Sequence, residues 1–381
     1  MARMARMAWT VCTGVLAALV AGLAVPRAAA SQQWDELVVT AGISGESYDG
    51  NLASVTVPVV DSANAVGAAV GEFGLRGSGW ILNRENTNLF GSFDLGMRQF
   101  LASGFEIRDY SPRERSGRAS LQLLQRLGDV GLLRISGDGW RRSIDDRPPM
   151  PLFLQPGYTR FAGLTQVTFR EIDGVIFDVS LDAEVADYEA PDGVGQINLL
   201  DRESQGFELG ASWGRDWQVR FFGSYRRLEY PEQSSFDPSD PYRRDRTLTV
   251  GGEWRYASSA FQAEVGLEGI VNRSNSRRPE YDAISVRSLV GLPLPWWGLG
   301  VNLYAVVTGK SYVSLTPFAR LVPGEEADNA SIVYLDVNRE VAPNLDASVR
   351  FGFTRGETDI GDAYYQRYGM SFFLNYRPWV R

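Results

Sequence analysis

Residues 345–354 read Leu-Asp-Ala-Ser-Val-Arg-Phe-Gly-Phe-Thr, and residues 368–376 read Tyr-Gly-Met-Ser-Phe-Phe-Leu-Asn-Tyr. In both stretches apolar side chains alternate with polar or small ones. Successive side chains of a β-strand point to opposite faces, so each stretch predicts a strand with one apolar and one polar face. A polar loop between them predicts an antiparallel hairpin. Such strands fit either a half-buried β-sandwich or the wall of a membrane barrel with a wet lumen.

The same alternation recurs along the chain, for example as Phe-Asp-Val-Ser-Leu-Asp-Ala-Glu-Val at residues 177–185. It predicts about sixteen strands, with fourteen as the alternative, and the first strand is expected at residues 36–43. The connections alternate in length, with a short turn at residues 342–344 and a longer polar link at residues 316–329. Short turns at one end and long loops at the other are typical of outer-membrane barrels. We therefore expect an all-β, transmembrane, antiparallel up-and-down β-barrel over residues 31–381.

The N-terminal residues 1–30 have the composition of a secretory signal peptide. Arg3 and Arg6 precede an apolar run over residues 7–25, and Ala28-Ala29-Ala30 follows it. A charged segment, an apolar segment and a small-residue site in this order predict cleavage, here after Ala30. The alternative is a membrane anchor helix. With cleavage, the chain is expected in the cell outer membrane, where lipid and the barrel assembly machinery would be its partners.

Composition excludes several kinds of chemistry. The chain has no histidine, and its one cysteine, Cys12, lies in the predicted signal peptide. This removes disulfides, histidine or cysteine metal sites, and the histidine-dependent nucleophiles that outer-membrane lipases and proteases use. The net charge of −8 argues against nucleic acid as a partner. We therefore expect no enzyme activity and no cofactor.

Alternation also predicts which charged side chains face the lumen. Acidic residues spaced by two or four positions in one strand share a face, as Glu264 and Glu268 do. They could form a path for cations or sugars or a Ca²⁺ site, or they could be a solvated wall balanced by arginines. The lumen-facing candidates are Asp178, Asp182, Glu184, Arg220, Glu253, Arg255, Glu264, Glu268, Arg287, Asn302 and Arg350.

Aromatic residues are sorted between the two kinds of connection. Tryptophans gather near the short turns, as expected for a belt at a membrane–water interface. These belt candidates are Trp80, Trp213, Trp217, Trp254, Trp296, Trp297 and Trp379. Tyrosines near the long links predict a second belt: Tyr110, Tyr188, Tyr230, Tyr281, Tyr312, Tyr364 and Tyr365.

Over residues 35–381 the chain resembles Gram-negative, porin-like outer-membrane β-barrel proteins. The likeness rests on the signal peptide, the alternation, the unequal connections and the aromatic belts together. Such chains usually end in an aromatic residue, whereas this one has Pro378 in register and ends at Arg381. A second segment, Asn272-Arg-Ser-Asn275 followed by Tyr281-Asp282, is similar to loop-to-strand patterns in barrels of the surface lipoprotein assembly modifier type. That family carries a helical repeat domain before its barrel, for which we expect no room here.

These observations predict a channel or transport pore for small polar solutes. Two alternatives stay open: an export component for polysaccharide or surface lipoprotein, and a plugged structural or adhesion barrel. The sequence indicates neither the solute nor the oligomeric state.

Overall fold

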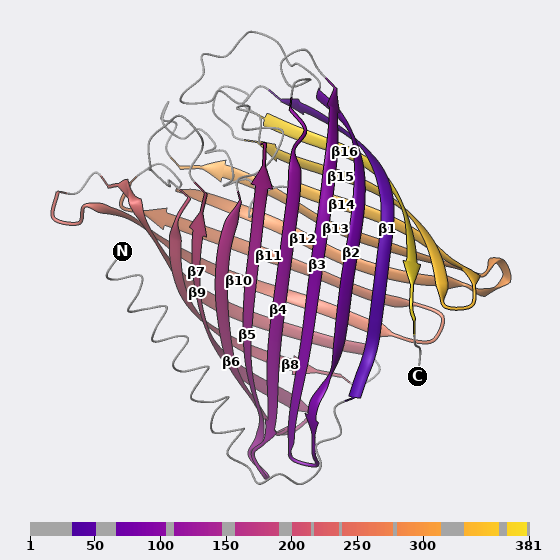
Figure 1. Ribbon diagram of the computed structural model, residues 1–381. Coiled ribbons are helices and arrows are strands. Elements are labelled where there is room, and N and C mark those ends of the chain that lie inside the picture. Colours follow the sequence, from indigo (N-terminus) through magenta and orange to yellow (C-terminus); the bar gives the residue numbers. More distant parts are fainter. Residues whose placement is uncertain are drawn as a thin grey trace.

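Sixteen antiparallel strands form one closed barrel in which each strand pairs with its neighbours in the chain and β1 pairs with β16 (Figure 1). The computed structural model describes residues 33–50, 66–103, 110–146, 157–189, 200–214, 217–235, 238–276, 280–313, 331–357 and 364–378. The strands are β1 (Gln33–Gly50), β2 (Val66–Asn83), β3 (Thr87–Ser103), β4 (Arg113–Arg126), β5 (Gly131–Asp145), β6 (Tyr158–Phe169), β7 (Val175–Tyr188), β8 (Arg202–Trp213), β9 (Trp217–Ser234), β10 (Tyr242–Ala257), β11 (Gln262–Ser274), β12 (Tyr281–Leu294), β13 (Leu299–Tyr312), β14 (Ser331–Ala342), β15 (Leu345–Glu357) and β16 (Tyr364–Tyr376).

The predicted fold class and the count of sixteen strands are confirmed. The connections also alternate as expected: residues 343–344 join β14 to β15, whereas residues 313–330 join β13 to β14. The first strand is longer than its predicted range of residues 36–43. Its alternation is hard to read because outward positions such as Gly45 and Ser47 carry small side chains, and because a bulge interrupts the β1–β2 register between Trp34 and Glu36.

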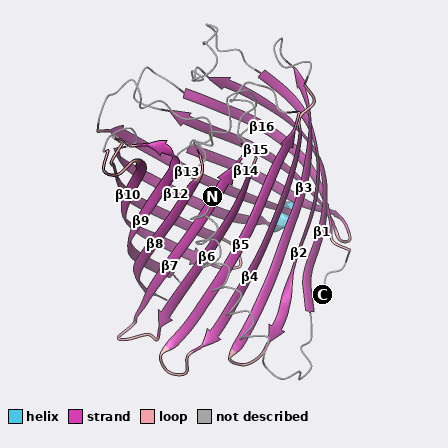
Figure 2. Cartoon of the chain, turned by 60° about the vertical axis from the view of Figure 1, so that its left-hand side comes forward, coloured by secondary structure: helices cyan, strands magenta, loops and turns pink. Residues whose placement is uncertain are grey.

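A single 3₁₀ turn, η1 (Pro295–Trp297), joins β12 to β13. Figure 2 shows the remaining described chain as one continuous wall of strands. None of the described residues forms a helix long and apolar enough to cross a membrane. The described elements are wall strands and η1, so none of these elements crosses the lumen.

The barrel carries its apolar side chains on the outside. Ile43, Val250 and Ile284 point outward and are 68%, 62% and 64% exposed, while Asp178 and Glu253 are 6% and 8% exposed on the opposite face. Because paired residues of antiparallel strands project to the same side, the two faces remain separate around the whole ring. The result is a wall with an apolar outer surface and a charged inner surface.

Candidate functional site

The inward face is the candidate functional site, because most of the charged side chains within the strands gather there. Inward and outward positions are fixed by the register, as where Asn302 pairs with Asp336 while Leu303 pairs with Leu335. The structure places on the inward rows every predicted lumen-facing residue: Asp178, Asp182, Glu184, Arg220, Glu253, Arg255, Glu264, Glu268, Arg287, Asn302 and Arg350.

Arg220 of β9 joins two carboxylates from neighbouring strands. Its Nη2 lies 2.7 Å from Asp178 Oδ1 of β7 and 2.6 Å from Glu208 Oε1 of β8. The Gln166 amide donates a further hydrogen bond to Asp178 at 3.2 Å. The guanidinium carbon of Arg220 lies 5.2 Å from the centre of the Phe222 ring, which is nearly buried. These contacts hold the guanidinium of Arg220 against the side chains of β7, β8 and β9.

A second set of ion pairs continues on β10, β11 and β12. Arg255 bonds Glu253 and Glu264, each at 3.0 Å. Arg287 bonds Glu268 and lies 3.4 Å from Glu253. Glu253, which has little exposure, is therefore shared between two arginines.

The two sets meet because Arg220 and Glu253 are paired residues of β9 and β10. We call the combined set the carboxylate patch. It contains five carboxylates and three arginines, namely Asp178, Glu208, Glu253, Glu264, Glu268, Arg220, Arg255 and Arg287. Acidic groups thus exceed basic groups by two, and the local potential of this part of the wall is negative.

A different network, which sequence reasoning missed, lies on β16 and β1 to β5. Arg98 bonds Glu46 and approaches Glu72 at 3.7 Å and Glu114 at 3.5 Å. Arg367 of β16 bonds Glu46 at 2.6 Å. Arg142 of β5 completes the set by bonding Glu114 at 3.0 Å. Within the part of the chain that the structure describes, three carboxylates face three arginines, and this balanced network fastens the seam where the barrel closes.

The other predicted lumen residues form local pairs. Asp182 bonds Arg226 at 3.1 Å. Arg350 bonds Asp336 at 3.2 Å, beside Asn302. Glu184 lies between two arginines, with Arg160 at 2.7 Å and Arg202 at 3.2 Å.

The predicted second belt of tyrosines is wrong for four of its members. Tyr188 pairs in register with Tyr158, Tyr281 pairs with Tyr312, and Tyr230 is nearly buried under Arg243 at 4.1 Å. Their rows are those of the inward residues, so these rings line the lumen. Nearness to a long loop does not decide whether a residue faces lipid. The face depends on whether the residue is an even or an odd number of positions from a known inward residue of its strand. Tyr110 lies just before β4, and the side chains of Tyr364 and Tyr365 lie outside the described residues.

Several belt tryptophans do lie on the outer surface near the short connections. Trp217 and Trp254 are outward and exposed. Trp213 stacks on the outward Phe221 with 5.2 Å between ring centres. Trp296 and Trp297 form most of η1 and are 74% and 63% exposed.

Trp80 behaves differently from the other tryptophans. It pairs in register with Phe90, with ring centres 5.2 Å apart, on the inward row of Gln122. Its face follows from strand parity, because Trp80 is an even number of residues from the inward Glu72 and the register shift in β2 comes only after Trp80. Trp379 lies outside the described residues.

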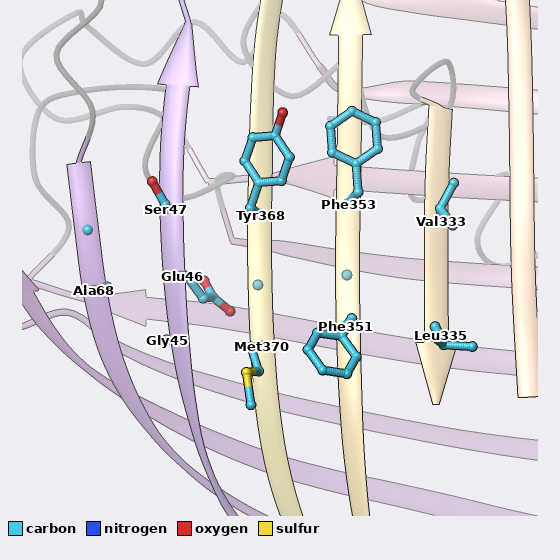
Figure 3. A pocket seen from close by; sticks show the side chains of 13 residues that line it. Gly45, Glu46, Ser47, Ala68, Val333, Leu335, Phe351, Phe353, Tyr368 and Met370 are labelled. Carbon is cyan, nitrogen blue, oxygen red and sulfur yellow. The ribbon is translucent and has the colours of Figure 1, made fainter. Parts of the chain in front are cut away.

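A hollow of about 740 Å³ lies on the outer surface of the described barrel, over β14 to β16, the end of β1 and the start of β2. Figure 3 shows Phe351, Phe353, Tyr368 and Met370 along β15 and β16, with β14 on one side of them and β1 on the other. Gly45 on the neighbouring strand contributes no side chain. The lining is mostly apolar. The hollow therefore arises where large side chains of β15 and β16 lie beside small residues of β1 and β2.

The inward carboxylates of the described residues lie beside arginines and not beside one another alone. No group of three or more His, Cys, Asp or Glu residues there could hold a metal ion. Each of the larger carboxylate clusters instead contains arginines within ion-pair distance.

The comparisons with known proteins give general likenesses. No family model and no curated protein matches the chain. Among solved structures, OmpF of Salmonella typhi in complex with daunomycin has 10% identity over 90% of this chain and 99% of that chain, with a TM-score of 0.41. OccD3 (OpdP) of Pseudomonas aeruginosa has 8% identity over 92% and 95%, with a TM-score of 0.39. A bacterial polysaccharide outer membrane secretin has 10% identity over 90% and 98%, with a TM-score of 0.39. Scores at this level carry no argument about activity, and the description of the barrel rests on its own strand pairing.

Proposed function

We propose that this chain is an outer-membrane β-barrel that forms a diffusion pore for small polar solutes. The carrying observation is a closed wall of sixteen strands with an apolar outer face and a charged inner face. A wall of this kind satisfies every strand hydrogen bond within the ring, which is the condition for placing β-structure in hydrocarbon. The predicted signal peptide supports the same location, and the long connections would then face the cell exterior.

The number of strands supports a water-filled lumen. For sixteen strands spaced about 4.8 Å apart and tilted by about 40°, the backbone ring has a diameter on the order of 30 Å. Inward side chains cannot fill a ring of that width, and barrels of this size leave an aqueous channel. The inward arginines that are held by carboxylates of the wall, such as Arg220, are consistent with an open path.

The carboxylate patch supports a preference for cations. Its excess of acidic groups raises the local concentration of positive ions in a narrow space bounded by low-dielectric walls. The balanced network around Arg98 makes no such contribution. We therefore propose a pore that admits small polar solutes of either charge and passes cations more readily.

Planar lipid bilayers test this function. Purified protein should give stepwise, ohmic conductance, and a KCl gradient should give a reversal potential of the sign expected for cation preference. Glu264→Gln together with Glu268→Gln should shift that potential toward anions. Asp145→Asn is the control, because this residue lies on the outer face and pairs with Arg115.

Correctly folded protein without conductance would overturn the proposed pore function and favour a plugged barrel or an export component. A reversal potential that is unchanged in the glutamine variant would retain the pore but remove the carboxylate patch as the origin of selectivity.

A further inference from the structure

Three arginines stand side by side on the outer face near the end of the barrel with long connections. Arg246 of β10 is the paired residue of Arg227 on β9 and also of Arg273 on β11. We call these three the arginine row. Like charges directly opposite each other on one face of a sheet destabilise it, so the row has a cost that an anion would relieve.

The two outer members of the row have carboxylate partners and the middle one does not. Arg227 bonds Glu229, and Arg273 bonds Asp282 at 2.8 Å. Arg246 is exposed and forms no ion pair with any residue that the structure describes. The free positive charge of the row is therefore that of Arg246, while Glu229 also bonds Arg244, which in turn bonds Asp240.

The surface on the short-turn side of the row is apolar. Two residues along each strand from the arginines, about 6.6 Å away, lie Tyr225, Leu248 and Val271, which again pair with one another. Leu248 is 51% exposed. The arginine row is thus the edge of the apolar band on these three strands.

The next outward row has a shape that suits flexible chains. Val250 stands between Gly223 and Gly269, its paired residues on β9 and β11. A Cβ on either glycine would come no closer than about 3.9 Å to any neighbour, so both positions are open. Val250 therefore stands between two open positions, which lie beyond Tyr225 and Val271 as seen from the arginine row.

We propose that the arginine row and the apolar rows next to it bind an anionic membrane lipid, with its phosphate at Arg246 and its acyl chains passing over Leu248 to the two open positions beside Val250. A guanidinium donates paired hydrogen bonds that match phosphate oxygens. One free positive charge fits the single negative charge of a phosphodiester. The adjoining apolar rows select a membrane lipid over free phosphate, because phosphate alone would leave them unused. The proposal rests on the membrane location given above.

The test measures lipid retained by the detergent-purified protein, using native mass spectrometry with phosphatidylglycerol or phosphatidylcholine of identical chains. The wild type should retain phosphatidylglycerol preferentially. Arg246→Gln should weaken that retention about fivefold, since an arginine near a membrane surface contributes about a factor of five in affinity for anionic lipid. Glu229→Gln, which removes the carboxylate shared by Arg227 and Arg244, should strengthen it.

Arg141→Gln is the matched control. Arg141 is also an exposed arginine on the outer face at the same end, but its paired residues are Gly117 and Thr159, so no arginine adjoins it. Retention should be unchanged in this variant. Equal losses for Arg246→Gln and Arg141→Gln would show general charge attraction and overturn the site.

Inorganic phosphate in the buffer distinguishes the two sources of the anion. Phosphatidylglycerol should stay bound at phosphate concentrations far above that of the lipid, whereas complete displacement would show a plain phosphate site. Bilayer conductance of Arg246→Gln should equal that of the wild type, because the residue faces away from the lumen. The lipid measurement on Arg246→Gln therefore tests lipid binding separately from the proposed pore function.

Discussion

Arg220→Met should destabilise the barrel by about 3 kcal/mol, at the lower end of the cost of breaking a buried ion pair. The side chain of Arg220 is 17% exposed, and that of its partner Asp178 is 7% exposed. Methionine keeps the length and removes the charge, so Asp178 retains the Gln166 amide but loses its ionic partner. Glu208, at 29% exposure, can reach lumen water and adds less to the loss.

Urea unfolding from phospholipid vesicles, followed by tryptophan fluorescence, measures this loss. Arg350→Met is the control, because Arg350 is 49% exposed and bonds Asp336 alone among the ion pairs described for it. Its loss should be about 1 kcal/mol or less, as for a solvated pair. Adding Asp178→Asn and Glu208→Gln to Arg220→Met should restore most of the stability, since no uncompensated charge then remains. Equal losses at Arg220 and Arg350, or no recovery in the triple variant, would refute a network that depends on Arg220.

Three further predictions concern the barrel wall, a turn and the predicted signal peptide. Leu303→Arg should cost roughly 2–4 kcal/mol if the residue lies near the bilayer midplane, and Asn302→Arg much less, because the first points to lipid and the second to the lumen; comparable costs in vesicle unfolding would mean that the faces are reversed. Gly131→Ala should cost about 1–3 kcal/mol, because Gly131 has φ +152° and a Cβ there would lie 2.0 Å from the Thr168 carbonyl oxygen; wild-type stability would remove that argument. N-terminal sequencing of protein from the outer membrane should begin after Ala30, and retention of Met1 would contradict cleavage.

The strands and their faces could be predicted because they depend on local alternation. Phe177 and Asp178 are adjacent in the chain and lie on opposite faces in the barrel, as the pattern indicates. The same alternation would have corrected the prediction of a second belt of tyrosines. Tyr281 is an even number of residues from the inward Arg287, so its parity already placed it inside.

The Arg98 network could not be predicted in the same way. Glu46 meets Arg367 only after sixteen strands close on themselves, and the pairing depends on the exact stagger of β1 against β16. Alternation gives the face of each residue but not its height relative to a distant strand. The arginine row has the same origin, since Arg227, Arg246 and Arg273 become neighbours through the register of three strands.

The most direct test of the two-faced wall is the reaction of single cysteines with a membrane-impermeant thiol reagent in lipid vesicles. Asn302→Cys and Leu303→Cys are compared in a background that carries Cys12→Ser. The cysteine at position 302 should react rapidly from the water-filled lumen, while the one at position 303 should stay protected by lipid until detergent is added. Equal reaction at both positions, or faster reaction at 303, would contradict a barrel with lipid outside and water inside.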